Sequence, residues 1–439
     1  MKFRNPIDTI INRAKESELI KGFLSSAIWG VLTKVIMVVV TFYCSNTLAP
    51  EGFGEFSFIK ETLNLVLAIC AVNFSTLTVK LAAESMTVEN SLRRLYLLFI
   101  FTIVVTLLLA FIVIVLPYDV LYSFTKGENV AYFVRVSALL LPFFIIQPLV
   151  SAVFRGYKQF NLVGIYETAS SILFLLFVII GVKIADYQGA IWAMLGYYFV
   201  FSLSGLLILF KYNQKTHYLV KVKNISSQRK TIYTMIAPIF LTSFIEAPLV
   251  WIAQAEIGRR ASYALVGALS VMLTIRYLIQ IVPTYFYQSF VPHVTILNAE
   301  QKYRSYFVKF EQVTKALLVL AVVVGPILII FGKFFLGLFN KAYVDYYDSY
   351  LWSIAVVPFL LLSTLFKINL MIREHQVSIM IMTILSSLLF IGSFYLFAEF
   401  CDNILYAFFY AQAFQFGCQL MYSLKIYFSE KFKLISKSA

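Results

Sequence analysis

The sequence predicts an all-α polytopic membrane protein whose twelve transmembrane helices form two halves of six. Of its 439 residues, 61% are hydrophobic and only 13% are charged, whereas soluble domains average roughly 25% charged residues. Apolar runs of about 20 residues recur from end to end, which is the length that an α-helix needs to cross a bilayer. A membrane β-barrel would show shorter, alternating segments instead. The third observation is a residue pattern of the first half that recurs in the second.

Short polar loops separate the predicted spans, and none of these loops is long enough to form a soluble domain. The spans are predicted at 23–48, 56–79, 95–116, 132–154, 162–182, 188–210, 232–254, 263–290, 314–331, 350–372, 376–398 and 403–424.

The two ends of the chain are polar. Residues 1–22 are charged throughout and show no small-residue cleavage site, so they do not form a cleavable signal. Ile7, Ile10 and Ile11 repeat at helical spacing, which fits an interfacial helix, and a solvated tail fits equally well. Residues 425–439 form a basic tail.

Charge placement predicts that both ends face the cytoplasm. With that orientation, 25 of the 36 lysines and arginines lie in inner segments and six lie in outer loops, as the positive-inside rule requires. The net charge of +14 is then explained by contact with anionic membrane lipids, without nucleic acid as a partner.

The longest inner connection, residues 211–231, separates an N-lobe at 23–210 from a C-lobe at 232–424. At an offset of 216 residues, residues 137–174 and 353–390 share nine identities in 38 positions. An even number of spans gives both lobes the same topology, so they are predicted to be parallel repeats. Secondary transporters commonly place their site at the interface of such repeats.

Signatures of soluble enzymes and of metal sites are missing from the sequence. It contains no GxxxxGK[ST] motif for an ATP-driven module and no HExxH motif, and its four cysteines are scattered without a CxxC pair. We therefore expect no catalytic residues, no metal and no cofactor, apart from a coupling proton or Na⁺.

Nine charged residues fall within the predicted spans or at their ends. A charge at bilayer depth costs roughly 2.5–3.5 kcal/mol, so such residues usually face a protein interior or a water-filled cavity. The six cations outnumber the three anions, which indicates a pathway for an anionic solute. The residues are Lys34, Lys60, Glu61, Lys80, Arg135, Glu167, Glu246, Arg276 and Lys367.

Depth along the spans gives these residues different expected roles. Four cations are expected to line a cationic cavity: Lys34, Arg135, Arg276 and Lys367. Lys60 and Lys80 lie near span ends, where they either join that cavity or extend to the headgroups.

The carboxylates have roles of their own. Glu246 is the first candidate for binding a coupling proton or Na⁺ and Glu167 is the second, and structural pairing with a cation is the alternative for each. Glu61 follows Lys60 directly, so the two point to different sides of a helix.

Several loop motifs, in their order along the chain, resemble those of bacterial polysaccharide flippases. These proteins move O-antigen and related units, and they belong to the multidrug/oligosaccharidyl-lipid/polysaccharide exporter (MOP) superfamily. The motifs are LAPEGFGEF at 48–56, NFSTLTVK at 73–80, LRR at 92–94, FRGYK at 154–158, YQGA at 187–190 and FVP at 290–292.

This resemblance implies two six-helix lobes that form a V around a central cationic cavity. It implies a bacterial inner-membrane flippase, acting in O-antigen, lipopolysaccharide or other polysaccharide biosynthesis. The substrate would be an undecaprenyl-diphosphate-linked oligosaccharide, passed from the inner to the outer leaflet by an antiporter-type alternating-access cycle. A polysaccharide polymerase or chain-length machinery would be a partner. Among the intramembrane charges, Lys80 fits the pattern of the family best.

Three alternatives remain open on the sequence. A multidrug or small-molecule exporter of the same superfamily should have an acidic cavity. An O-antigen polymerase or ligase should carry a large outer loop, but the longest outer loops here span only 117–131 and 332–349. A structural scaffold would explain neither the repeat nor the buried charges.

Overall fold

A computed structural model describes residues 18–85, 89–216, 236–373 and 375–438. Every regular element in this part of the chain is a helix, which confirms the predicted fold class. The first half holds α2 (Glu18–Thr47), α3 (Pro50–Leu67), the π-helix η1 (Ala68–Val72), α4 (Asn73–Ser85), α5 (Glu89–Val115), α6 (Tyr118–Thr125), α7 (Glu128–Phe144), α8 (Ile146–Gly156) and α9 (Phe160–Thr216).

The second half begins after the connection between the lobes. It holds α11 (Ala237–Arg260), α12 (Tyr263–Ala299), α13 (Tyr303–Ile330), α14 (Gly332–Phe339), the 3-10 helix η4 (Lys341–Tyr346), α15 (Tyr347–Ala355), α16 (Val357–Ile372), α17 (Gln376–Phe400) and α18 (Ile404–Ser438). Most of the predicted connection at 211–231, and residues 1–17 of the predicted N-terminal segment, lie outside the described residues. Residues 425–438 of the basic tail continue α18.

Nine of the described helical segments are long and apolar enough to cross a membrane. One of them, α9, contains two of the predicted spans. The helical backbone is interrupted between these spans at Ala185 and at Asp186, where φ is 52°. The total of twelve spans stays a prediction.

Two corresponding spans are broken near prolines. α7 and α8 meet at Ile145, three residues before Pro148, and α15 and α16 meet at Val356, two residues before Pro358. Proline removes one helical hydrogen bond and its ring clashes with the preceding turn, which accounts for both breaks.

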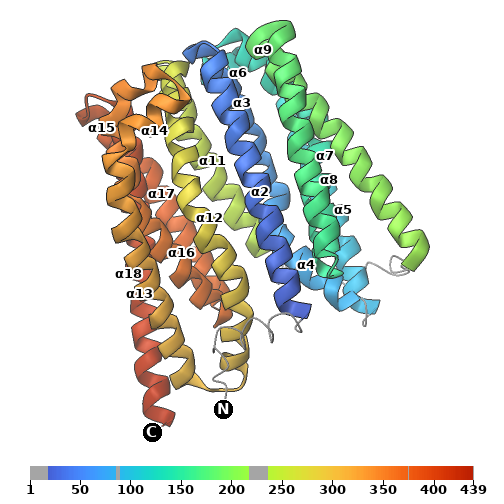
Figure 1. Cartoon of the computed structure of the whole chain (residues 1–439), viewed down its shortest axis with the longest axis vertical. Coiled ribbons are helices and arrows are strands. Elements are labelled where there is room, and N and C mark those ends of the chain that lie inside the picture. Colours follow the sequence, from blue (N-terminus) through green and yellow to red (C-terminus); the bar gives the residue numbers. More distant parts are fainter. Residues whose placement is uncertain (1–17, 86–88, 217–235, 374, 439) are drawn as a thin grey trace, which may run out of the picture.

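The helices form two groups, with the first half on the right and the second half on the left of Figure 1. Within the first half, α2 packs along α9 and α4 along α8, and within the second half α17 packs along both α18 and α11. The most extensive contact between the halves joins α3 to α12.

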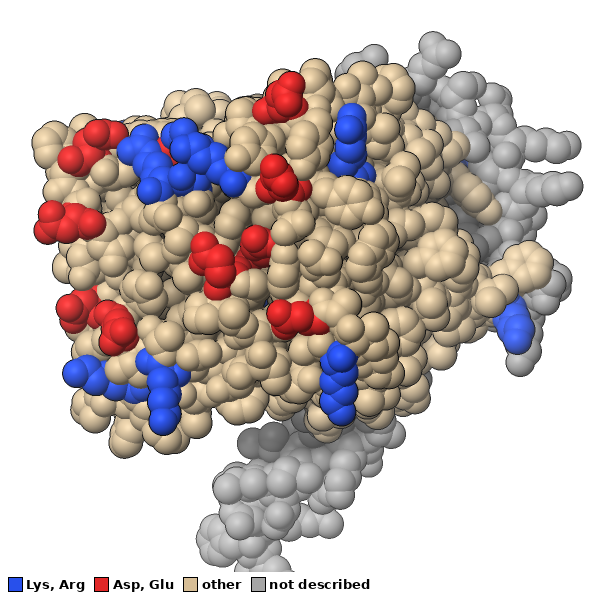
Figure 2. Space-filling model, turned by 90° about the horizontal axis from the view of Figure 1, so that it is seen from above, with Lys and Arg blue, Asp and Glu red and all other residues tan. Residues whose placement is uncertain are grey.

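The two ends of the molecule contain different connections between helices. The upper end in Figure 1 contains the α2–α3, α11–α12 and α17–α18 junctions, and the lower end contains the start of α2 and the end of α18. The sequence predicts that the upper end faces outward. Figure 2 shows this end, with acidic side chains near its centre as well as at its rim.

Candidate substrate cavity

A cavity of about 580 Å³ lies between the two halves, where α2, α3, α9 and α12 meet. Its charged lining residues are Lys34, Lys60 and Glu61. The polar ones are Thr41, Asn64, Tyr198, Ser270, Thr274, Tyr277, Gln280 and Thr284.

α12 supplies more of this lining than any other helix. Ser270, Thr274, Tyr277, Ile281 and Thr284 line the cavity and recur every three or four residues, so their side chains lie above one another along one side of the helix.

Two lysines form a cationic wall of the cavity. Lys34 comes from α2 and is exposed, and Lys60 comes from α3 and is half-buried. The two are electrostatic neighbours. Neither forms an ion pair with a carboxylate of the described residues. The wall therefore carries positive charge that is available to an anionic ligand.

Other lining residues supply hydrogen-bond acceptors and aromatic rings. Successive residues of a helix point about 100° apart, so Lys60 and Glu61 point in different directions although both line the cavity. Asn64 Nδ2 donates to Glu61 Oε1 at 3.3 Å. Glu61 is an electrostatic neighbour of Tyr198 and Tyr277. Sequence reasoning did not identify Glu61 as a site residue.

Arg276 points into the second half and does not line the cavity. Its side chain is only 5% exposed, and its Nη1 donates to Gln412 Oε1 of α18 at 2.6 Å. Arg276 lies at the edge of the cavity-lining face of α12, because Leu273 and Gln280, one turn before it and one turn after it, line the cavity. Its side chain turns away from the cavity, towards α18.

Two other expected cavity cations also lie elsewhere. Arg135 binds the end of α5: its Nη2 donates to the carbonyl oxygens of Ile114 at 2.7 Å and Leu116 at 3.0 Å. Lys367 is half-buried on α16 and is not among the lining residues of the cavity. The side chain of Lys80 lies outside the described part of the structure.

The two candidate coupling carboxylates have different surroundings. Glu167 accepts two hydrogen bonds from Arg155 Nη2, at 2.6 and 2.8 Å, and it is an electrostatic neighbour of Lys34. Glu246 is half-buried on α11, outside the lining of the cavity. Pairing is thus the observed state of Glu167.

Above the cavity, hydrogen bonds join the end of α2 to the end of α14. Asn46 Nδ2 donates to the Leu338 carbonyl oxygen at 2.9 Å, and Ser45 Oγ donates to the Phe339 carbonyl oxygen at 3.0 Å. In the opposite direction, Asn340 Nδ2 donates to the Ser45 carbonyl oxygen at 2.9 Å. These bonds satisfy backbone carbonyls that helix ends leave without a partner.

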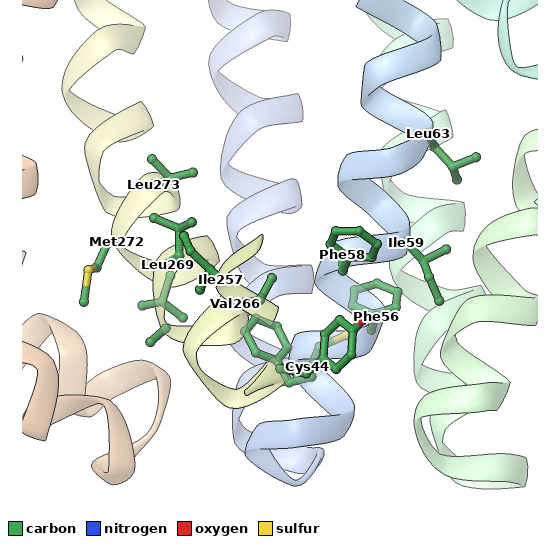
Figure 3. Close-up of a cluster of buried hydrophobic side chains, with 14 of the residues drawn as sticks. Cys44, Phe56, Phe58, Ile59, Leu63, Ile257, Val266, Leu269, Met272 and Leu273 are labelled. Carbon is green, nitrogen blue, oxygen red and sulfur yellow. The ribbon is translucent and has the colours of Figure 1, made fainter. Parts of the chain in front are cut away.

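The α3–α12 contact closes the same end. Figure 3 shows Phe58 and Ile59 of α3 in one buried cluster with Val266 and Leu269 of α12. A Cβ atom on Gly54 would lie 1.7 Å from the carbonyl oxygen of Tyr263, so only glycine permits this approach.

Polar contacts reinforce this closure. The Ala264 backbone N–H donates to Glu51 Oε2 at 2.6 Å, and Tyr263 Oη donates to the Thr125 carbonyl oxygen at 2.6 Å. Each of these bonds joins the two halves, so the upper end is held by both apolar and polar contacts.

The two seams between the halves differ below this closure. At the back, α11 packs against the first half at several levels: Trp251 contacts Phe58 with ring centroids 5.4 Å apart, and Phe240 contacts Phe101 at 5.6 Å. Ile236 is buried in a further cluster with residues of α4. At the front, the cavity lies between α2 and α12, where Tyr277 is 57% exposed.

The described residues contain no candidate metal site, because no three His, Cys, Asp or Glu side chains among them are grouped so that they could hold a metal ion. The four cysteines are free, and Cys44 and Cys70 are buried. The expectation that there is no metal site stays a prediction for the chain as a whole.

Comparison with known proteins gives one family and one fold. A family model described as "Polysaccharide biosynthesis protein" matches residues 19–298. No curated protein gives a significant match.

Several solved structures are similar to the chain over nearly its whole length. An inward-facing multidrug resistance MATE family transporter of the MOP superfamily aligns with a TM-score of 0.74 at 13% identity, covering 93% of this chain and 96% of the other. An outward-facing multidrug resistance MATE family transporter aligns with a TM-score of 0.67 at 12% identity, covering 94% and 96%. A MOP superfamily transporter from Pyrococcus furiosus Vc1, described by the reverse polarity of its binding pocket, aligns with a TM-score of 0.67 at 13% identity, covering 95% and 96%.

Proposed function

The chain belongs to the family of polysaccharide biosynthesis proteins, and we propose that it is a flippase for undecaprenyl-diphosphate-linked oligosaccharides. It has the fold of MOP superfamily transporters. The proposed reaction moves the polar head from the inner to the outer leaflet of a bacterial inner membrane, with both termini in the cytoplasm. The observation that carries the proposal is the presence of two lysines, Lys34 and Lys60, that line the cavity between the halves and form no ion pair with the described carboxylates.

The diphosphate explains why the cavity needs cations. A diphosphate in hydrocarbon would lose its hydration without compensation, which is prohibitively costly. Lysine ammonium groups offer charge-assisted hydrogen bonds to phosphate oxygens, which are stronger than hydrogen bonds between neutral groups. Two lysines from different helices can contact both phosphates of the cargo.

The front seam explains where the lipid tail would lie. On α2, Val31, Val35 and Val39 are exposed at 39%, 46% and 41%, and on α12, Leu278, which lines the cavity, is exposed at 39%. Apolar exposure of this kind suits a surface that faces lipid. The tail would stay in the bilayer beside α2 and α12 while the diphosphate occupies the cavity.

Transport would proceed by alternating access. The upper closure separates the cavity from the predicted outer side, so the described conformation suits loading from the lower end. Release would require the α3–α12 and α2–α14 contacts to part. We propose proton or Na⁺ coupling through Glu246, because Glu167 is held by Arg155.

A reconstituted assay tests the proposal. The purified protein is placed in liposomes that contain a fluorescent polyprenyl-diphosphate oligosaccharide, and loss of the label from one leaflet is followed over time. Lys34→Gln and Lys60→Gln should each slow flipping about tenfold or more, because each removes one charge-assisted contact of the diphosphate.

Lys341→Gln is the matched control, because Lys341 is exposed at the upper end and does not line the cavity. It should flip the lipid at the wild-type rate. Full activity in both cavity variants, at equal protein density, would contradict the proposal.

A second function has one observation in its favour. The solved structures that share the fold include multidrug resistance transporters, and the cavity here contains a carboxylate, Glu61, that could contact an organic cation. The same liposomes can be loaded with a fluorescent cationic dye. Dye export that Glu61→Gln abolishes, without any lipid flipping, would favour the multidrug exporter.

A further inference from the structure

The charged side chains that line the cavity differ in the ligand groups that they can bind. Lys34 and Lys60 carry only hydrogen-bond donors, whereas the carboxylate of Glu61 carries only acceptors when it is ionised. Glu61 is the one carboxylate among the described lining residues. A simple anion would satisfy the lysines and be repelled by Glu61, so the cavity suits a ligand that joins an anion to a group rich in O–H or N–H donors.

The groups around Glu61 also suit a sugar. Asn64 and Gln280 line the cavity, and their amides both donate and accept hydrogen bonds. Tyr198 and Tyr277 are electrostatic neighbours of Glu61 from two different helices. Tyr277 is 57% exposed, so its ring offers an apolar face to the C–H groups of a pyranose while its hydroxyl reaches the ring substituents.

The size of the cavity limits how much of the cargo it can hold. Its volume of about 580 Å³ falls within the range of roughly 300–1,000 Å³ that is typical of sites for drug-sized ligands. A diphosphate and its first sugar are of that size, but a longer oligosaccharide is not. Recognition in the cavity therefore concerns the sugar nearest the diphosphate, and the remaining sugars extend beyond it.

We propose that Glu61, Asn64, Tyr277 and Gln280 form a subsite for the first sugar of the cargo, and that this sugar is neutral or bears an amide. The subsite disfavours a uronic acid in that position, because its carboxylate would face the carboxylate of Glu61. This inference rests on the proposed flippase function and adds to it the chemical class of the first sugar.

The test uses two synthetic polyprenyl-diphosphate lipids that differ only in their first sugar, one with a neutral hexose and the other with the corresponding uronic acid. The wild-type protein in liposomes should flip the neutral lipid about tenfold faster than the uronate, which corresponds to about 1.4 kcal/mol of discrimination. Glu61→Gln, which keeps the shape of the side chain, should reduce this ratio to about one.

Two further variants test whether the effect on the rate ratio is specific to Glu61. Lys60→Gln should slow both lipids by the same factor, because it acts on the shared diphosphate. Glu128→Gln removes an exposed carboxylate at the upper end and should leave the ratio of the two rates unchanged.

The remaining outcomes are each decisive. If Glu61→Gln slows both lipids equally, the sugar subsite is wrong and the flippase function stands. If it abolishes the pH dependence of flipping and keeps the ratio, Glu61 is a coupling group and the subsite is again wrong. If the wild-type protein flips neither lipid, the proposed function itself is wrong.

Discussion

At the scale of single residues, Arg276 is distinguished by its environment. It is buried to 5% exposure in the second half, and its hydrogen-bond partner Gln412 is neutral. A buried cation loses hydration that a neutral acceptor only partly replaces. We therefore assign Arg276 a structural role in joining α12 to α18, separate from the cavity.

Replacing Arg276 should affect stability more than transport. Arg276→Ala leaves the amide oxygen of Gln412 buried without its donor and opens a void, so we expect a loss of about 2–3 kcal/mol in the free energy of unfolding. Thermal unfolding in detergent should show a clear decrease in Tm. The flipping rate per folded molecule should stay near the wild-type value.

The double variant Arg276→Met, Gln412→Leu is the control. It replaces both partners of the hydrogen bond by apolar side chains, which can be nearly neutral or stabilising in a buried site, so it should regain much of the lost Tm. A single variant that keeps its Tm but loses transport would instead place Arg276 in the substrate pathway.

The contrast between Arg276 and Lys34 shows what the sequence could predict about residues. Both lie about midway along a span, and depth alone indicates that each must face a protein interior or a cavity. The direction of the side chain depends on helix rotation. Leu273 and Gln280 lie one turn from Arg276 and line the cavity, so spacing along α12 alone does not reveal that Arg276 points towards α18 instead. Glu61 and Lys60 depend on how α3 is rotated against α12, which the sequence does not specify.

At the scale of elements, the contact between α3 and α12 determines whether the upper end stays closed. Gly54 permits this contact, because a Cβ atom there would overlap the carbonyl oxygen of Tyr263. Unlike a long side chain, this backbone atom cannot move aside by changing rotamer. A single added methyl group must therefore separate the two helices or displace their backbones.

Gly54→Ala should shift the molecule towards a state that is open at the upper end. A cysteine placed at Thr41, a lining residue of the cavity, should then react several-fold faster with a membrane-impermeant maleimide added from the outer side. The background protein for this measurement lacks its native cysteines.

Gly325→Ala is the matched control, since no atom of the described residues lies within 4 Å of the position that its Cβ would take. It should leave the reaction of the Thr41 cysteine unchanged. Equal rates in the two glycine variants would show that the α3–α12 contact does not control access.

The sequence predicted the helices more reliably than their interruptions. Apolar length identified two spans within 162–210, and the structure confirms a break between them at Ala185 and Asp186. The predicted span 56–79 is instead three consecutive pieces, α3, η1 and α4. The π-helix at Ala68–Val72 contains neither glycine nor proline, so its sequence gives no local signal for the interruption.

At the scale of the whole molecule, the arrangement of the ends can be tested through the native cysteines. Cys401 lies between α17 and α18 at the upper end, outside the helix that ends at Phe400. Cys44 and Cys70 are buried. If the upper end faces outward, a membrane-impermeant maleimide added to intact cells should label Cys401, and Cys401→Ser should abolish that labelling.

The labelling should also depend on pH. Burial and the neighbouring Asp402 raise the pKa of the Cys401 thiol above its usual range, so less of the reactive thiolate is present at neutral pH. The rate of labelling should therefore continue to rise as the pH increases past the ordinary pKa of a thiol. Labelling of Cys401 only from the inner side would reverse the predicted orientation.

The overall architecture was largely predictable because it follows from properties that sum over many residues. Hydropathy defined the helices, and the pattern around Pro142 and Pro358 indicated two related halves. The upper closure was not predictable, because contacts such as Asn46 with the Leu338 carbonyl oxygen join residues 292 positions apart. No short sequence pattern predicts which of such distant residues will be in contact.

The packed seam along α11 has a consequence for how the two halves could move. This seam stays in contact from Ile236 to Trp251. We therefore expect it to act as a hinge about which the halves rotate, while the opposite edge, between α2 and α12, opens and closes. A polyprenyl chain on that free edge would then remain in hydrocarbon throughout the cycle. Only the sugar and the diphosphate would cross through protein, and no lipid would need to be threaded through a closed channel.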